Sequence, residues 1–182
     1  VEPLPADPAG LPADVEELRA TTVGKLGENM VIRRFARFDL ASPGKLQLYI
    51  HPGNKLAVLV TLLSGKAETV ATHEFQELCT DIGMQIAAAA PTTVDRTELT
   101  KDVLDRELEI AKEQARQTGK PEAVIEKIAI GKMEKIYSEL CLLEQPFVKD
   151  PKFTVTTHLE EVAKKLGDTI SIREFARFKI GE

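Results

Sequence analysis

The stretch LGDTISIREFARF, residues 166–178, decides how this chain is organised, because LGENMVIRRFARF at residues 26–38 nearly repeats it. Eight of the thirteen positions are identical, and the copies start 140 residues apart. In each copy a short helix is expected to end at Leu-Gly, with the glycine as a left-handed cap, and a strand to follow. The duplication predicts two related subdomains, each using one helix-Gly-strand unit to build a sheet that helices cover.

Strand signals continue after the first copy. Residues 30–40 carry apolar side chains at a mixed spacing, and their β-branched and aromatic content favours a strand with a bulge near Ala36. Two further strands are predicted at 46–51 and 56–63, joined by the turn sequence PGN. The second of these is apolar throughout, so it should be the central, covered strand of its sheet.

Helical periodicity dominates from residue 72 onwards. Apolar residues recur every three or four positions between Thr72 and Pro91, which predicts a helix that covers the sheet. Two charged helices at 100–140, divided by the sequence TGKP, predict an antiparallel, coiled-coil-like hairpin. Its narrow apolar stripe is expected to pack within the hairpin, with self-association or a partner face as the alternative; the stripe comprises Leu104, Leu108, Ile125 and Met133.

The predicted fold class is therefore α+β: two related subdomains with small antiparallel sheets covered by helices, plus the inserted helical hairpin. Only a proline-rich tail precedes the helix that leads into the first copy, so the opening strands of its subdomain are expected upstream of Val1. The expected divisions are the tail at 1–12, the remainder of the first core subdomain at 13–40, the first part of the second at 41–99, the hairpin at 100–140, and the return helix and strand at 141–182.

Composition narrows the classes of partner. The 24 basic and 29 acidic residues give a net charge of −5 without a basic block, so direct nucleic-acid binding is not expected. No apolar run reaches the roughly 18 residues that cross a bilayer, and no membrane partner is expected. Cys79 and Cys141 fall in apolar surroundings, which predicts two reduced, inert core thiols.

Signals for catalysis are missing from the sequence. Every Gly-Lys pair lacks the neighbours of a phosphate-binding loop, and neither G-x-S-x-G nor H-E-x-x-H occurs. The three histidines, His51, His73 and His158, have no spacing that suits a metal site. We therefore expect no catalytic residues, no metal and no cofactor, and a binding protein rather than an enzyme.

Several segments together carry a family resemblance. In order along the chain they are KLGENMVIRRFARF, YIHPGNKLAVLV, DIGMQIAAAAP, the long run that ends in LLEQPFVKDP, and FARFKIGE. From about Ala13 to the end, the chain resembles the core of bacterial-type translation elongation factor Ts, and LLEQPFVKDP is the most specific of these segments. The resemblance implies two repeats of one α+β fold, with a helical hairpin inserted in the second.

That resemblance also implies a function, guanine nucleotide exchange on elongation factor Tu, in its GDP-bound and nucleotide-free forms, during protein biosynthesis. The implied partner-binding residues are Leu26, Gly27, Glu28 and Asn29 on the nucleotide-domain side, and Tyr49, His51 and Gly53 toward the third domain. The family's Thr-Asp-Phe-Val segment, which wedges near the magnesium site, is expected upstream of Val1. Weak exchange is therefore expected from residues 1–182 alone, in a bacterial cytoplasm or, for an organellar protein, a plastid or mitochondrion.

Other interpretations stay open. The chain could be a non-catalytic scaffold or ribosome-associated module that docks on elongation factor Tu, or a homodimer formed through the hairpin. Leu26 and Gly27 could simply end a helix, and His51 could be an ordinary loop histidine. The arginines of the repeated motif could bind an acidic partner, although arginines between core residues more often line a solvated or ion-paired face; these are Arg33, Arg37, Arg173 and Arg177.

Overall fold

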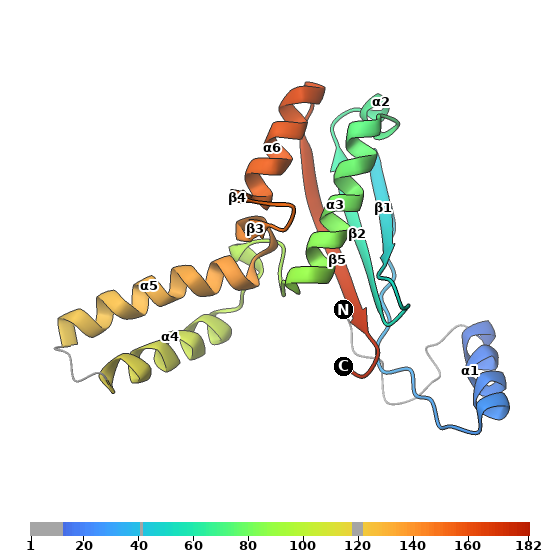
Figure 1. The fold of residues 1–182 in the computed structure, drawn as a ribbon, viewed down its shortest axis with the longest axis horizontal. Coiled ribbons are helices and arrows are strands. Elements are labelled where there is room, and N and C mark those ends of the chain that lie inside the picture. Colours follow the sequence, from blue (N-terminus) through green and yellow to red (C-terminus); the bar gives the residue numbers. More distant parts are fainter. Residues whose placement is uncertain (1–12, 41, 118–121) are drawn as a thin grey trace. The chain divides into compact units, whose positions relative to one another are not determined.

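The computed structural model describes residues 13–40, 42–117 and 122–182, which fall into two compact units (Figure 1). One unit spans residues 1–39 and the other spans residues 40–182. The predicted proline-rich tail and the TGKP turn of the hairpin lie outside the described residues. Within the described part of the chain, no helix is both long and apolar enough to cross a membrane.

The first unit consists of helix α1, Ala13–Leu26, and an extended segment. Gly27 has φ +70°, and its N–H donates to the Val23 carbonyl at 2.9 Å, so the predicted left-handed cap is confirmed. The guanidinium of Arg19 binds the Glu16 carboxylate and also donates to the Met30 carbonyl at 3.1 Å. Arg19 thereby holds the chain that follows the turn against the helix.

The strand predicted at 30–40, with its bulge near Ala36, is wrong. Apart from an isolated bridge residue at Arg34, this segment has no regular secondary structure. The three-stranded sheet of the described chain consists of β1, β2 and β5 alone. A strand is stabilised by a run of hydrogen bonds to a neighbouring strand, and within the described residues 30–40 only Arg34 lies in a bridge, so local propensity was not sufficient.

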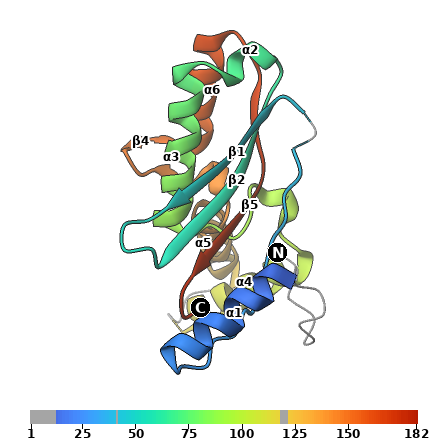
Figure 2. The ribbon, with the colours of Figure 1, turned by 90° about the vertical axis from the view of Figure 1, so that its right-hand side faces the viewer.

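The second unit is built on an antiparallel sheet of β1 (Gly44–Ile50), β2 (Leu56–Ser64) and β5 (Ile170–Lys179) (Figure 2). The strand order is β1-β2-β5, which confirms β2 as the central strand. The second copy of the motif does form a strand, β5. Its register shifts opposite Thr61 and Leu62, so that Arg173 is an extra residue in a β-bulge.

Two helices cover one face of this sheet. Helix α3 (His73–Ala89) lies over β1 and β2, and α6 (Val155–Leu166) lies beside it (Figure 2); a short helix, α2 (Ala67–Val70), precedes α3. The hydroxyl of Thr72 accepts from the Phe75 N–H and caps α3, as the sequence predicts. The core between the layers includes Val58, Val60, Leu62, Phe75, Leu78, Ile82 and Ile86, all at most 1% exposed.

A buried glutamine explains much of the LLEQPFVKDP segment. The amide of Gln85, on α3, donates to the Gln145 side chain at 3.1 Å and to the Pro146 carbonyl at 3.2 Å. Its oxygen accepts from the Val148 N–H at 2.7 Å. These bonds hold the small sheet of β3 (Pro146–Phe147) and β4 (Asp150–Thr154) onto α3. Because a buried amide needs partners for every polar atom, this segment is tied to one arrangement.

The hairpin consists of α4 (Lys101–Arg116) and α5 (Glu122–Leu140), flanked by the 3₁₀ turns η2 (Arg96–Glu98) and η3 (Leu142–Glu144). Ile125 and Met133 of the predicted stripe are buried, together with Ala111 and Ala129. Leu104 and Leu108, the other two residues of that stripe, are half-buried, and α4 packs against α5. The expectation that this stripe packs within the hairpin is therefore confirmed. Cys79 and Cys141 are both buried free thiols, also as predicted, and burial raises the pKa of Cys79 to about 12.

Candidate functional site

The Leu26 turn is exposed. Gly27 carries the chain out of α1 in the left-handed conformation, and Leu26 is 61% exposed at the end of the helix. Glu28 and Asn29 are exposed as well, and a Cβ added at Gly27 would meet no other atom within 4 Å. The four residues of the first predicted site therefore form one accessible turn, with an apolar side chain at its edge.

The equivalent turn after α6 is occupied by internal contacts. Leu166 packs against the hydrophobic core, and Gly167 has φ +60°. The Asp168 carboxylate accepts from the Ser64 hydroxyl at 2.6 Å and from the Lys66 backbone N–H at 3.2 Å. Hydrogen bonds from the Ser64 and Thr69 side chains, with smaller contributions from the backbone N–H groups of Thr169 and Lys66, lower the pKa of Asp168 to about 2. The second turn thus connects the end of α6 to the end of β2 through internal hydrogen bonds.

The second predicted site lies at the β1–β2 turn. The His51 N–H donates to the Leu56 carbonyl at 2.9 Å, and the turn passes through Gly53 with φ +92°. The Tyr49 hydroxyl lies 3.2 Å from Nδ1 of His51, and the two rings are tilted by 50°. Tyr49, His51 and Gly53 are therefore brought together at one tip of the sheet, with His51 and Gly53 exposed.

Helix α3 explains why Tyr49 is held in place. A Cβ on Gly83 would lie 2.9 Å from the Tyr49 Cβ, so only glycine lets the helix approach β1 this closely. The Tyr49 ring is thus partly packed under α3 while its hydroxyl reaches His51. This close approach gives the Gly83 of the DIGMQIAAAAP segment a physical role.

Two apolar residues beside this tip were missed by the sequence analysis. Ile180 donates its backbone N–H to the Lys55 carbonyl at 2.8 Å, which brings the end of the chain to the β1–β2 turn. Ile180 and Ile50 are both more than half exposed. The position of Ile180 beside the turn depends on the antiparallel pairing of β2 with β5, which joins residues 106 to 123 positions apart and gives no local signal.

The arginines of the repeated motif lie in ion pairs. Arg37 lies 3.5 Å from Asp39, Arg173 lies 3.5 Å from Glu174, and Arg177 lies 3.0 Å from Glu182. The interpretation of an ion-paired face is favoured for these three side chains over an acidic-partner site.

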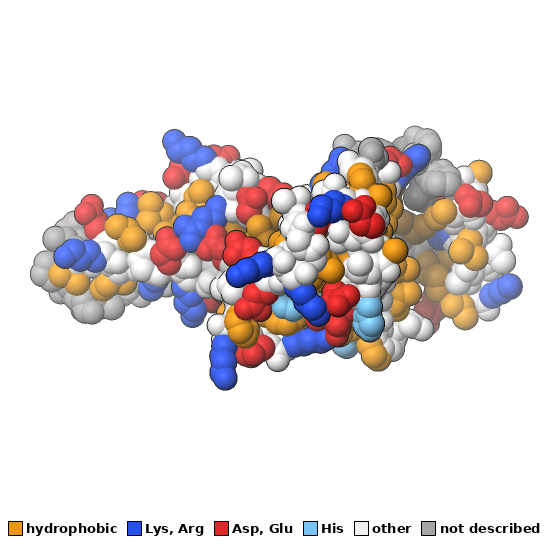
Figure 3. Space-filling model, turned by 90° about the horizontal axis from the view of Figure 1, so that it is seen from above, with side chains coloured by type: hydrophobic (Ala, Val, Ile, Leu, Met, Phe, Trp, Pro, Cys, Tyr) orange, Lys and Arg blue, Asp and Glu red, His pale blue; other side chains and the backbone are white. Residues whose placement is uncertain are grey.

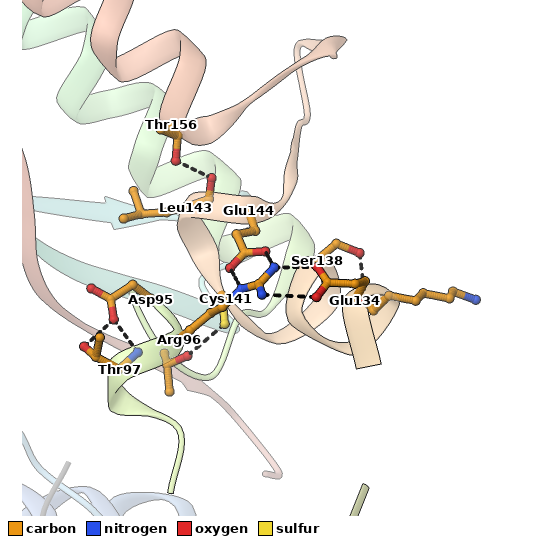
Figure 4. Close-up of polar contacts among 11 residues, drawn as sticks. Asp95, Arg96, Thr97, Glu134, Ser138, Cys141, Leu143, Glu144 and Thr156 are labelled. Atoms are coloured by element: carbon orange, nitrogen blue, oxygen red, sulfur yellow. Dashed lines mark hydrogen bonds and ion pairs between the residues drawn. The ribbon is translucent and has the colours of Figure 1, made fainter. Parts of the chain in front are cut away.

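A further polar cluster fixes the base of the hairpin (Figure 4). The Arg96 guanidinium donates to Glu144 at 2.5 Å and to Glu134 at 2.7 Å, and it stacks over the Tyr137 ring at 4.0 Å. The bond from Arg96 lowers the pKa of Glu134. One side chain thus joins η2, α5 and η3, and this network sets the direction in which α5 leaves the sheet.

Comparison with known sequences places the chain among translation factors. The family described as Elongation factor TS matches residues 5–182. Elongation factor Ts of Trichlorobacter lovleyi is 41% identical over 184 aligned residues, which cover 100% of this chain and 59% of that protein. The corresponding protein of Anaeromyxobacter sp. strain K is 50% identical, covering 78% of this chain and 65% of its own length. That of Desulfovibrio desulfuricans is 40% identical over 97% of this chain.

The chain thus spans about three-fifths of the length of these curated relatives. The match runs through both copies of the repeated motif, the hairpin and the LLEQPFVKDP segment. With a family match over nearly its whole length and relatives at 40–50% identity, this chain belongs to the elongation factor Ts family of translation elongation factors.

Proposed function

We propose that this chain binds elongation factor Tu and promotes release of GDP from it, using two contact regions. The first is the turn from Leu26 to Asn29, and the second is the tip formed by Tyr49, His51 and Gly53. The observation that carries the proposal is the contrast between Leu26, 61% exposed after its cap, and Leu166, partly buried against the core after an equivalent cap. An exposed leucine beside a rigid glycine turn is suited to enter a pocket on a partner.

The proposed activity is a coupling of two binding equilibria and involves no bond making. A factor that prefers nucleotide-free elongation factor Tu weakens GDP binding, and GDP weakens binding of the factor by the same ratio. Side chains on this chain therefore need only stabilise the open form of the partner better than the GDP-bound form. The bacterial sources of the relatives favour a bacterial cytoplasm as the place of action.

A docking role without exchange is the second candidate. Residues 1–182 contain no Thr-Asp-Phe-Val segment, the element implied to act near the magnesium site. This stretch of chain would then contribute affinity and orientation, while acceleration depends on that element. If the docking role is correct, the chain serves as a scaffold on elongation factor Tu.

The two candidates separate in one titration. Elongation factor Tu loaded with fluorescent GDP is mixed with increasing amounts of the chain, and GDP release and complex formation are followed together. Accelerated release supports exchange by residues 1–182, whereas binding at an unchanged release rate supports the docking role. If no complex forms at micromolar concentrations of both proteins, the proposed contacts are wrong.

Matched variants locate the contact on α1. Leu26→Ala should weaken the complex at least about tenfold, the cost of losing a contact of about 1.4 kcal/mol. Leu18→Ala serves as control, because Leu18 is 67% exposed on the same helix. Equal losses for both variants would show that Leu26 has no specific role.

At the second contact region, the tip at the β1–β2 turn, Tyr49→Phe removes only the hydroxyl that reaches His51. If this pair orients the histidine toward elongation factor Tu, Tyr49→Phe and His51→Ala should weaken binding, and the double variant should be no weaker than His51→Ala alone. Additive losses would mean that the two side chains act independently.

A further inference from the structure

Arg19 bridges the two parts of the first unit, α1 and the extended segment that follows it. Its Nε donates to Oε2 of Glu16 at 2.9 Å, and its Nη2 donates to Oε1 of the same carboxylate at 2.5 Å. A two-pronged bond of this kind fixes the plane of a guanidinium. The remaining nitrogen, Nη1, donates to the Met30 carbonyl at 3.1 Å. Glu16 thus aims Arg19 at the backbone just beyond the exposed turn at 26–29.

The turn at 26–29 is closed at both of its ends by hydrogen bonds within the first unit. At its start, the Gly27 N–H donates to the Val23 carbonyl at 2.9 Å. Just past its end, the Met30 carbonyl accepts from Arg19. Closing a segment at both ends removes backbone freedom that binding would otherwise have to remove. The turn is therefore held in shape before a partner binds.

Apolar packing contributes little to the order of this turn. None of the residues of α1, all of which the structure describes, is buried. Met30 is half-buried, and the four residues of the turn are exposed. Figure 3 shows the unit that contains α1, at the right of the view, with apolar side chains exposed beside charged ones of both signs. In this setting the bond from Arg19 is a main restraint on the shape of the turn.

The second copy of the motif has apolar residues at the equivalent positions. At the offset of 140 residues, Arg19 corresponds to Leu159, and Met30 corresponds to Ile170. Leu159 and Ile170 are 8% and 7% exposed and belong to one hydrophobic core cluster. In the second unit the core therefore orders the chain that follows the helix. In the first unit, where little apolar surface is buried, the hydrogen bond from Arg19 takes that place.

We propose that Arg19 is a positioning residue for the contact with elongation factor Tu: it holds the turn at 26–29 in the shape that places Leu26 on the partner. The inference rests on the proposed function, in which Leu26 enters a pocket on elongation factor Tu. Arg19 itself is assigned no contact with the partner, because its Nε, Nη1 and Nη2 atoms all donate within the first unit. Without Arg19, elongation factor Tu has to order the turn as it binds, which raises the dissociation constant.

The first measurement follows the turn in the free chain. Arg19→Met keeps a good helix former in α1 but removes the bond to Met30, so the circular dichroism signal of the helices should stay the same. Backbone order parameters of residues 27–31, from NMR relaxation, should fall from about 0.85 to below about 0.6. Lys25→Met makes the same change of net charge, and Lys25 takes no part in the bonds made by Arg19 and Gly27. This control should leave the order parameters unchanged.

The second measurement is the dissociation constant of the full chain for nucleotide-free elongation factor Tu. Arg19→Met should raise this constant about tenfold. Arg19→Lys keeps the charge, but a single ammonium does not reproduce the fork that binds Glu16 and Met30 together, so it should raise the constant by a similar factor. In a Leu26→Ala background, Arg19→Met should cost less than about twofold, whereas in a His51→Ala background it should again cost about tenfold.

These results separate positioning from a direct contact and from loss of structure. A loosened turn with native affinity overturns the proposal, and so does a turn that stays ordered in Arg19→Met. Losses that add fully with Leu26→Ala also overturn it, because Arg19 would then act apart from the turn. Weak binding by Arg19→Met beside native binding by Arg19→Lys with a loosened turn would assign a charge contact with the partner instead. If the native chain forms no complex, the proposed function fails and the role of Arg19 falls with it, and that failure is visible before any variant is measured.

Discussion

The two copies of the repeated motif differ in outcome although their sequences nearly coincide. In both, a helix ends at a glycine with positive φ, +70° at Gly27 and +60° at Gly167. Only the second copy continues into a strand, β5, which pairs with β2 along its length. The comparison shows that a helix end is determined locally, whereas a strand forms only where a neighbouring strand and a core receive it.

The same difference decides which copy is available to a partner. The side chains of the second turn make internal contacts: Leu166 packs against the core, and Asp168 accepts a hydrogen bond from Ser64 at the end of β2. In the first turn, Leu26 and Glu28 remain exposed. A duplicated unit can therefore use one copy for stability and leave the other exposed, and the two copies offer pairs of equivalent residues that can be compared.

The largest difference is expected for the isoleucines of the motif. Ile172 is 8% exposed and packs in the core, whereas its equivalent, Ile32, is only half-buried. Ile172→Ala should lower the free energy of unfolding by about 3 kcal/mol, and Ile32→Ala by less than about 1 kcal/mol, because the cost follows the cavity that remains. Urea denaturation followed by circular dichroism measures both. Equal losses would show that the first copy is packed as firmly as the second.

Medium effects are expected at the capping glycines. A Cβ meets no other atom within 4 Å at Gly27 or at Gly167, so the strain of alanine comes from positive φ alone. That strain is about 1–2 kcal/mol for a residue other than glycine. Gly167→Ala should lower the stability of the second unit by that amount, since α6 is part of its core.

Gly27→Ala should act only on its own helix. Faster amide hydrogen exchange in α1, without a change in the main unfolding transition, is the expected result. A loss of global stability equal to that of Gly167→Ala would mean that the two copies unfold as one cooperative unit.

How much the sequence could predict follows from the same distinction. The Thr72 cap, the glycine ends and the burial of β2 were all predictable, because each rests on residues adjacent in the chain. The failure at 30–40 came from treating strand propensity as sufficient, although only Arg34 of that segment lies in a bridge. The network of Gln85 with Gln145 and the cluster around Arg96 join residues 38 or more positions apart, so composition and periodicity carried no trace of them.

The smallest effect, and the most specific, concerns the acidic residues after the two glycines. Asp168→Asn keeps the shape of the side chain but removes the charge of the carboxylate that accepts hydrogen bonds from Ser64 and Lys66. Glu28→Gln removes the charge of an exposed carboxylate. At pH 7, Asp168→Asn should lower Tm slightly, and Glu28→Gln should leave it unchanged.

The pH dependence distinguishes this charge effect from a loss of packing. The folded pKa of Asp168, about 2, lies below the roughly 3.9 of an unfolded aspartate. A lowered pKa contributes stability that is complete above the unfolded value and is lost as pH falls toward the folded value. The Tm difference between native chain and Asp168→Asn should therefore be constant from pH 7 to about 5, shrink below about 4, and vanish near 2. A difference that persists at pH 2 would assign the effect to packing around the turn and not to the charge of Asp168.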